Sequence, residues 1–188
     1  MEAKQEQKII NGVNVDQLFS TIDLIKQNPE VAKFKFRATN KWVNGTHCQA
    51  TVKDFFGALK EDTSRQPVVF HMDEPPVLLG NNQGTNPVEY LLVALSGCIT
   101  TSIVAHASAK GIKIKSIESR YEGDIDLRGF LGLSEDVPVG YQEIRIYFRI
   151  DADVSEQDKE EMLRMGQKFS PVFNTITKSA PVSVHLES

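Results

Sequence analysis

The spacing of apolar positions divides the chain into stretches with a helical period of about 3.6 residues and stretches with a strand period of two. The helical spacing predicts helices at 14–28, 86–111 and 155–178, the last one interrupted at Ser170-Pro171. Strict or near alternation predicts strands at 31–55, 67–72, 112–127, 141–150 and 182–186, and polar or turn-rich connections at 56–66 and 128–140. Strands grouped around helices in this order predict an α+β fold with antiparallel sheet.

The longest apolar stretch, 86–111, carries signals for both ends of a helix. Asn86 can cap the first turn, Pro87 suits the first helical position, and Glu89 lies where a carboxylate can reach back to the cap. Gly111 can supply the left-handed residue that ends a helix. The near absence of charge inside the stretch is typical of a buried helix. Its polar second half and its caps argue against a membrane span, so we expect no membrane partner.

Small residues recur along this helix and would let another backbone approach closely. They are Ala94, Ser96, Gly97, Thr101, Ser102, Ala105 and Ala109. Two packings are open: a core helix against a sheet, or two such helices against each other from two subunits. Cys98 lies on a strip with apolar carbon on one side and hydroxyl groups on the other. By position alone, a buried and unreactive cysteine is the ordinary interpretation, because free cysteine is among the most buried residue types.

Composition narrows the possible partners. A net charge of −4 over 188 residues argues against a nucleic-acid partner. The polar opening MEAKQEQK does not resemble a secretory signal, so we expect a cytoplasmic protein with reduced thiols. Its 2 cysteines make no disulfide framework. The four histidines, His47, His71, His106 and His185, are scattered and form no metal-ligand motif, so we expect neither a metal nor a cofactor.

The hairpin predicted at Asn44-Gly45 carries the second cysteine on its return strand. Alternation places Cys48 on the apolar face, where it reads as a small core residue without a redox role. His47 falls on the polar face, where we expect it to be solvated. His71, on the next strand, has no evident partner in the sequence.

Two motifs carry a family resemblance. The run DEPPVLLGNNQGTNPVEYLLVALSGC resembles the signature of the OsmC/Ohr family, and FSPVFNTI resembles its second motif, which normally begins Cys-Pro. The resemblance covers roughly residues 31–186 and implies a single OsmC-like domain over 31–188, preceded by a tail and amphipathic helix at 1–30. It further implies an intertwined homodimer, in which antiparallel sheets from both chains wrap two long central helices and the active sites lie at the subunit interface.

The resemblance also implies an activity. The characterised enzymes of the family are thiol peroxidases that reduce organic hydroperoxides. The cysteine of the first motif attacks the peroxide, and the cysteine of the second motif resolves the sulfenic acid. Cys98 matches the attacking cysteine, Glu89 matches the helix-start glutamate, and Arg37 is the arginine that fits by order along the chain. Ser170 stands at the resolving position, so the two-cysteine cycle does not follow and an external thiol would have to be the reductant.

Helix geometry leaves the roles of the charged residues open. Glu89 precedes Cys98 by nine residues, which puts it on the opposite face of a straight helix and roughly 13 Å along the axis. Either the helix breaks near Ser96-Gly97, or an arginine bridges the two groups, or Glu89 only caps its helix. Arg37 could equally be an exposed charge on a strand.

Three functions remain in competition. The leading interpretation is a one-cysteine hydroperoxide reductase, with a small hydroperoxide as substrate and an external thiol as reductant. The second is a dimer of the same fold that binds a small apolar or electrophilic ligand at its interface without turnover. The third is a dimer in which Cys98 serves packing alone, since fold by itself does not determine function.

Overall fold

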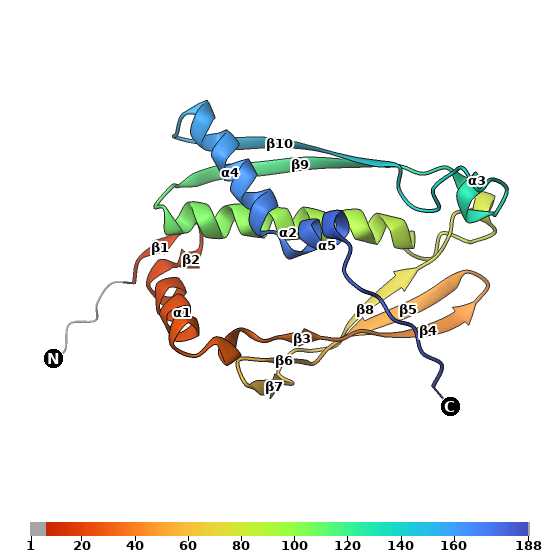
Figure 1. Ribbon diagram of the computed structural model, residues 1–188, viewed down its shortest axis with the longest axis horizontal. Helices are drawn as coiled ribbons and strands as arrows, with labels where there is room; N and C mark the ends of the chain where they lie inside the picture. Colours follow the sequence, from red (N-terminus) through yellow and green to blue (C-terminus); the bar gives the residue numbers. More distant parts are fainter. Residues whose placement is uncertain (1–6, 188) are drawn as a thin grey trace. The chain divides into compact units, whose positions relative to one another are not determined.

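The computed structural model describes residues 7–187 (Figure 1). This part of the chain forms two compact units: residues 7–8 with 14–91, and residues 9–13 with 92–187. The division falls between Leu91 and Leu92, inside the long helix α2. Each unit has its own sheets and is described by itself.

The first unit opens with the predicted amphipathic helix. Helix α1, Val15–Gln27, begins at Asn14, whose side chain accepts a hydrogen bond from the backbone N–H of Gln17. A 3-10 helix, η1, follows at Pro29–Ala32 and begins with the proline that was expected to end α1. The apolar side of α1 is largely exposed, with Phe19 and Leu24 about half accessible. The prediction of a surface helix is therefore confirmed.

Two antiparallel sheets complete the first unit. The strands are β3 (Lys35–Phe36), β4 (Thr39–Asn44), β5 (His47–Val52), β6 (Phe55–Gly57), β7 (Lys60–Asp62) and β8 (Val68–Met72). One sheet has the order β3-β6-β7 and the other β4-β5-β8. The hairpin at Asn44-Gly45 is confirmed, with Gly45 at φ +56°.

The prediction of a polar connection at 56–66 is wrong, because β6 and β7 form a hairpin there. Ala58 and Leu59, in the turn between them, both have positive φ. Glycine and asparagine usually fill such positions, since other residues are strained there. An Ala-Leu turn therefore gives no recognisable sequence signal.

Helix α2, Pro87–Ala109, ends as the sequence predicts. Gly111, at φ +77°, donates its N–H to the Ser108 carbonyl, and the Ile112 N–H reaches the Ala107 carbonyl. These two hydrogen bonds together form the Schellman motif, a common way for a helix to end. The helix runs without interruption through Ser96-Gly97, so the alternative of a break there is wrong. By length and composition alone α2 could also cross a membrane, a property that it shares with core helices of soluble proteins.

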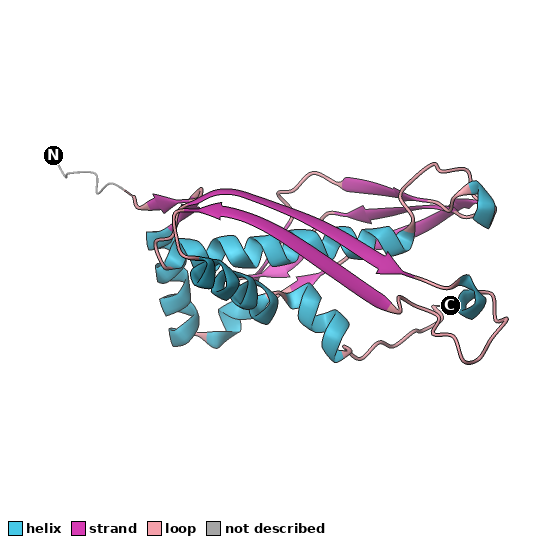
Figure 2. Ribbon diagram, turned by 90° about the horizontal axis from the view of Figure 1, so that it is seen from above, coloured by secondary structure: helices cyan, strands magenta, loops and turns pink. Residues whose placement is uncertain are grey.

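The second unit is built on a long two-stranded ribbon. Strands β9 (Ile114–Asp124) and β10 (Glu143–Ala152) pair antiparallel along almost their whole length (Figure 2). A short helix, α3 (Leu127–Phe130), begins at the last residue of the strand predicted at 112–127 and continues into the turn predicted at 128–140. Ile144, Ile146 and Phe148 face the core, as their alternation predicts. The buried centre of this core consists of Leu95, Ile99, Ile103, Ala107 and Met162.

Two helices close the second unit. Helix α4, Glu156–Phe169, begins with a capping box between Ser155 and Asp158. Helix α5, Pro171–Lys178, follows directly. Ser170 is both the C-cap of α4 and the N-cap of α5. Gly166 lets α4 approach α2 closely, since a Cβ there would lie 2.4 Å from Cγ1 of Ile103.

The chain ends differ from expectation. The strand predicted at 182–186 is wrong for this chain: residues 180–187 have no regular secondary structure, and Val182, Val184 and Leu186 are almost fully exposed. A strand exists only when a neighbouring strand pairs with it, and no pairing joins this segment to the described strands. Near the other end, two short strands, β1 (Ile9–Ile10) and β2 (Val13–Asn14), flank Asn11, whose side chain donates to the Ser108 hydroxyl and to the Ile112 carbonyl.

Candidate functional site around Cys98

Cys98 lies half-buried on α2, and its sulfur meets the beginning of another helix. The backbone N–H of Val172 donates to Sγ of Cys98 at 3.5 Å. Val172 is the second residue of α5, after Pro171 and the N-cap Ser170. The sulfur therefore lies at the N-terminus of α5, where Val172 is 74 residues further along the chain than Cys98.

This position has a chemical consequence. The first N–H groups of a helix have no partner inside the helix, and they carry the positive end of its dipole. A hydrogen bond to the sulfur stabilises its charged form, and the thiolate is the nucleophilic form of cysteine. Sequence reasoning searched for a side-chain cation and missed this source of stabilisation. The available signal was the helix start at Ser170-Pro171.

A network of hydrogen bonds holds the corner between α4 and α5 in place. Ser170 is fully buried, and its Oγ accepts the N–H of Phe173 at 3.2 Å. The side-chain amide of Asn174 donates to three carbonyl oxygens, those of Gln167, Lys168 and Ser170, at 2.9–3.2 Å. The hydroxyl of Ser102 on α2 donates to the Phe169 carbonyl at 3.2 Å. The corner that carries Val172 is thus tied both to itself and to the helix that carries Cys98.

Cys98, Ser102 and His106 are spaced by four residues and share one face of α2. The ring of His106 packs on Phe169, with centroids 4.5 Å apart. Burial lowers the pKa of His106, and the nearby Lys110 lowers it further. His106 therefore favours the uncharged form more than an ordinary histidine does, and it lies about 12 Å along the helix axis from Cys98.

Glu89 performs the capping role that was predicted as one of its alternatives. Its carboxylate accepts the N–H of Asn86 at 3.0 Å, and the Asn86 side chain accepts the N–H of Val88 at 3.0 Å. Glu89 is exposed and belongs to the first unit, whereas Cys98 belongs to the second. A catalytic role for Glu89 stays a prediction.

Arg37 also belongs to the first unit, where it follows β3 and forms an ion pair. Both of its terminal nitrogens reach the carboxylate of Glu61 at 2.8 Å. This bond raises the pKa of Arg37 and lowers that of Glu61. The pair is exposed, as expected for a strand charge, and the role of Arg37 toward Cys98 stays a prediction.

The histidines of the first unit correct two expectations. His47 is nearly buried at 9% exposure, so the prediction that it is solvated is wrong. Its Nε2 lies 3.1 Å from Nδ1 of His71, and the two rings stack. Strand β8 pairs with β5 so that His71 is opposite Gln49, two residues from His47 and on the same face. Pairing between strands 24 residues apart leaves no local signal, so sequence reasoning found no partner for either histidine.

The loop that leads into α2 is organised by a residue that sequence reasoning also missed. Asp73 is buried and accepts hydrogen bonds from the Thr46 hydroxyl and from the backbone N–H groups of Glu74, Asn81 and Gln83. The Thr46 hydroxyl and these amides hold the pKa of Asp73 well below its usual range. The charged Asp73 carboxylate thus holds the loop 73–85 in its conformation through these hydrogen bonds.

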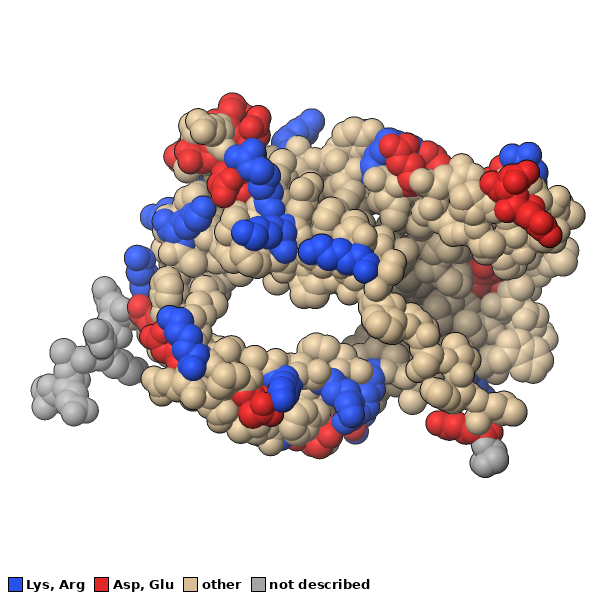
Figure 3. All heavy atoms as spheres, in the orientation of Figure 1, with Lys and Arg blue, Asp and Glu red and all other residues tan. Residues whose placement is uncertain are grey.

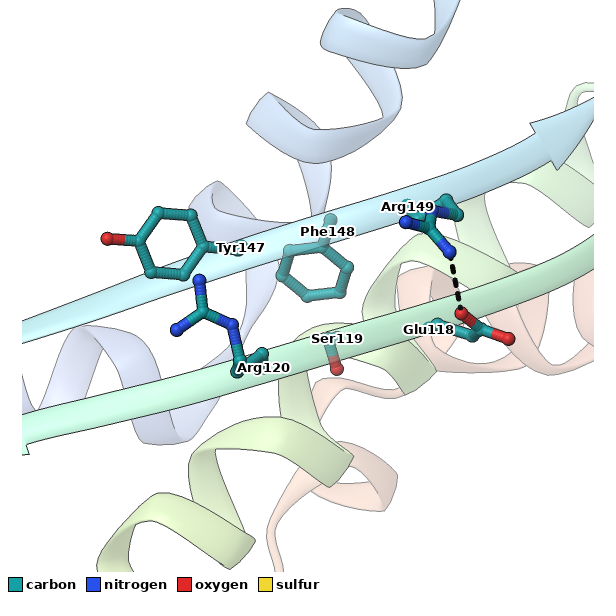
Figure 4. Close-up of a pocket in the computed structure, with 6 residues that line it drawn as sticks. All are labelled: Glu118, Ser119, Arg120, Tyr147, Phe148 and Arg149. Atoms are coloured by element: carbon teal, nitrogen blue, oxygen red, sulfur yellow. Dashed lines mark ion pairs between the residues drawn. The ribbon is translucent and has the colours of Figure 1, made fainter.

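Other candidate chemistry is weak in the part of the chain that the structure describes. No group of three or more His, Cys, Asp or Glu residues there is placed to hold a metal ion. A shallow depression of about 350 Å³ lies on the β9–β10 ribbon (Figure 4). In it the Arg120 guanidinium lies 4.2 Å over the Tyr147 ring and Arg149 pairs with Glu118, so its charges are already paired. On the face shown in Figure 3, acidic and basic side chains are interspersed, although several basic ones follow one another over α4 and α5.

Known proteins share this architecture. An OsmC-like protein from Mycoplasma pneumoniae is 20% identical, with 77% of this chain and 89% of that chain covered and a TM-score of 0.60. An OsmC-like protein of unknown function from Vibrio cholerae is 11% identical, covering 75% and 92%, with a TM-score of 0.56. An organic hydroperoxide resistance protein, OsmC, from Legionella pneumophila is 14% identical, covering 76% and 88%, with a TM-score of 0.54.

These likenesses confirm the predicted α+β fold with antiparallel sheets. No curated protein matches the sequence. The family model described as OsmC-like protein matches residues 80–185, more than half of the chain, and this range includes both Cys98 and Ser170. The chain therefore belongs to the family of OsmC-like proteins.

Proposed function

We propose that the protein reduces organic hydroperoxides through Cys98, with an external thiol as the reductant. The observation that carries the proposal is the hydrogen bond from the α5 N-terminus to Sγ of Cys98. A hydrogen-bond donor at the sulfur is the kind of partner that favours a nucleophilic thiolate, and Cys98 is only half-buried. Family membership supports the proposal, since one similar structure is named an organic hydroperoxide resistance protein.

In the proposed cycle the Cys98 thiolate attacks one peroxide oxygen. The O–O bond breaks, the sulfur becomes a sulfenic acid, and the alkoxide leaves and takes up a proton to give an alcohol. An external thiol then displaces water from the sulfenic acid to form a mixed disulfide. A second external thiol releases Cys98 and carries away the disulfide. Ser170 takes no covalent part, because a hydroxyl cannot form a disulfide; its oxygen caps α5 instead.

We further propose that the active form is a homodimer in the cytoplasm, in which residues 31–188 act as one domain. The alternating apolar residues Val182, Val184 and Leu186 are exposed and could pair with a strand of a second copy. Gly97 on α2 has open space beside it, so a second backbone could approach there. In such a dimer Arg37 and Glu89 would assist the thiolate, as the family resemblance implies.

The test is the oxidation of reduced protein by cumene hydroperoxide. The Cys48→Ser variant keeps the proposed nucleophile, and the Cys98→Ser variant removes it. We expect rapid stoichiometric oxidation of the Cys48→Ser protein, a sulfenic acid on Cys98 that dimedone traps, and no such product from Cys98→Ser. Oxidation of Cys98 no faster than that of a free small-molecule thiol would contradict the proposal.

The serine at position 170 favours one second candidate, a dimer that binds a small apolar or electrophilic ligand without turnover. In such a protein Cys98 would only line the ligand-binding site and would not react with peroxide. The same oxidation assay separates the candidates, because a binder would show the slow rate of a free thiol. A rise in the melting temperature of the protein on addition of an apolar electrophile from a panel would then support ligand binding.

A further inference from the structure

We propose that the oxidised sulfur of Cys98 is resolved by the backbone nitrogen of Val172, which forms a sulfenamide bond between α2 and α5. The inference rests on the proposed function, because it requires a sulfenic acid on Cys98. Sulfenic acids condense either with a thiol or with a backbone nitrogen. At this site the expected thiol is replaced by Ser170, whereas a backbone nitrogen lies at the sulfur.

The geometry favours this nitrogen. Val172 is in the first turn of α5, where a backbone N–H has no carbonyl partner within the helix. Its neighbour Phe173 donates to Oγ of Ser170, and the regular helical bonds begin with the N–H of Asn174. The Val172 N–H instead points at Sγ of Cys98, 3.5 Å away. A bond at this nitrogen would therefore break no hydrogen bond of the helix.

The surrounding network keeps the two atoms together. Asn174 ties the end of α4 to the start of α5 through three carbonyl oxygens, and Ser102 ties the same corner to α2 one turn from Cys98. Reactions between groups held in this way benefit from proximity, because no freedom must be lost in bringing them together. The other cysteine, Cys48, belongs to the first unit.

The chemistry balances without a further oxidant. An organic hydroperoxide oxidises the Cys98 thiolate by two electrons to the sulfenic acid and leaves as the alcohol. The sulfenic acid loses its OH and Val172 loses its amide proton, so one water leaves as the S–N bond forms. An external thiol cleaves this bond, which returns the proton to the nitrogen and leaves a mixed disulfide. A second thiol restores Cys98 and leaves with the first as their disulfide.

The product gives this one-cysteine protein a defined oxidised state. A sulfenic acid that stays exposed to peroxide proceeds to the irreversible sulfinic acid. The sulfenamide has no S–OH group to oxidise further, and a thiol reverses it. It would therefore serve the role that the second cysteine serves elsewhere in the family, using a backbone N–H group that every residue at position 172 except proline provides.

The experiment uses the full-length Cys48→Ser protein with one equivalent of cumene hydroperoxide. We expect an intact mass about 2 Da below that of the reduced protein, where a sulfenic acid would be about 16 Da above it. Peptide mapping without reductant should find the peptide containing Cys98 joined to the one containing Val172, and added thiol should separate them. The matched variant Val172→Pro lacks the N–H that bonds to the sulfur, so its Cys98 should be oxidised more slowly. The sulfenic acid that does form should stay reactive toward dimedone, pass to sulfinic acid with excess peroxide, and give no link to position 172.

The outcomes separate the inference from the function on which it rests. Rapid formation of a trappable sulfenic acid without a link to Val172 would overturn the sulfenamide and leave the peroxidase intact. A link to any other residue, or between two chains, would overturn it as well. Oxidation at the rate of a free thiol would overturn both. The peptide map of the Cys48→Ser protein decides the question even if Val172→Pro folds poorly.

Discussion

Oγ of Ser170 accepts the backbone N–H of Phe173 at 3.2 Å, inside a fully buried environment. Ser170, which the resemblance of FSPVFNTI to the second family motif places at the resolving position, is therefore the N-cap of α5. Serine is among the best N-cap residues, whereas cysteine is not among the preferred ones. A serine rather than a cysteine at this position thus favours the helix start that meets the sulfur of Cys98.

Ser170→Cys should place a second thiol at the N-cap of α5. We expect peroxide to link the introduced thiol to Cys98 as a disulfide, with loss of about 1 kcal/mol of stability from the weaker cap. Ser170→Ala is the matched control, since it loses the cap by a similar amount and offers no thiol. Peptide mapping and urea unfolding measure the two effects. Absence of the disulfide in a folded Ser170→Cys protein would show that positions 98 and 170 do not meet.

Asn174→Ala should loosen the corner between α4 and α5. It removes donors to three carbonyl oxygens, and net hydrogen-bond contributions of about 1 kcal/mol each predict a stability loss of about 1–3 kcal/mol. We also expect slower oxidation of Cys98 by peroxide, because Val172 is no longer held against the sulfur.

Thr177→Ala on the same helix is the control for this change. Its hydroxyl donates only to the Phe173 carbonyl one turn back, at 2.9 Å. The stability of this variant should change by a few tenths of a kcal/mol, and its rate of oxidation should not change. Equal rates for the Asn174 and Thr177 variants would contradict the positioning role of Asn174.

Two glycine-to-alanine changes should have opposite effects. At Gly166 a Cβ would lie 2.4 Å from Ile103, so overpacking of about 1–3 kcal/mol should outweigh the gain of about 1 kcal/mol in helix propensity. At Gly97 nothing lies within 4 Å, so the single chain should gain stability. Urea unfolding of both variants measures the difference.

Gly97→Ala also tests the proposed dimer. If the α2 helices of two copies pack closely at Gly97, the added methyl group should weaken self-association while the single chain gains stability. Sedimentation over a range of concentrations measures this. A dimer with unchanged affinity would show that the α2 helices do not meet at this position.

His106 should contribute a pH dependence to stability. Its pKa in the folded chain is lower than its ordinary value because of burial, so the unfolded chain binds the proton more tightly. The stability is then fully present above the ordinary histidine range near 6.5 and declines as the pH falls through that range toward the folded pKa. His106→Phe, which keeps an aromatic ring against Phe169, should flatten this slope as the pH falls below the ordinary histidine range. Unfolding curves with an unchanged slope would mean that His106 does not titrate differently on folding.

Sequence by itself determined most of the secondary structure. The ends of α2 follow from Asn86, Glu89 and Gly111, because each acts on backbone groups within a few residues of itself. The core face of β10 follows from strict alternation. The Ala58-Leu59 turn shows the limit of such reasoning, since a strained turn without glycine or asparagine leaves no mark in the sequence.

The tertiary structure alone decided the chemistry around the sulfur. The sequence identified Cys98 through its motif, but the donor at Sγ comes from Val172, on a helix that begins 73 residues later. The contact between His47 and His71 likewise depends on tertiary structure, because the pairing of β5 with β8 brings the two rings together. Local signals describe how a segment satisfies its own hydrogen bonds. Which distant segment then packs against it depends on the shapes of both faces and on burial of the whole core, and neither is written in any one stretch of the chain.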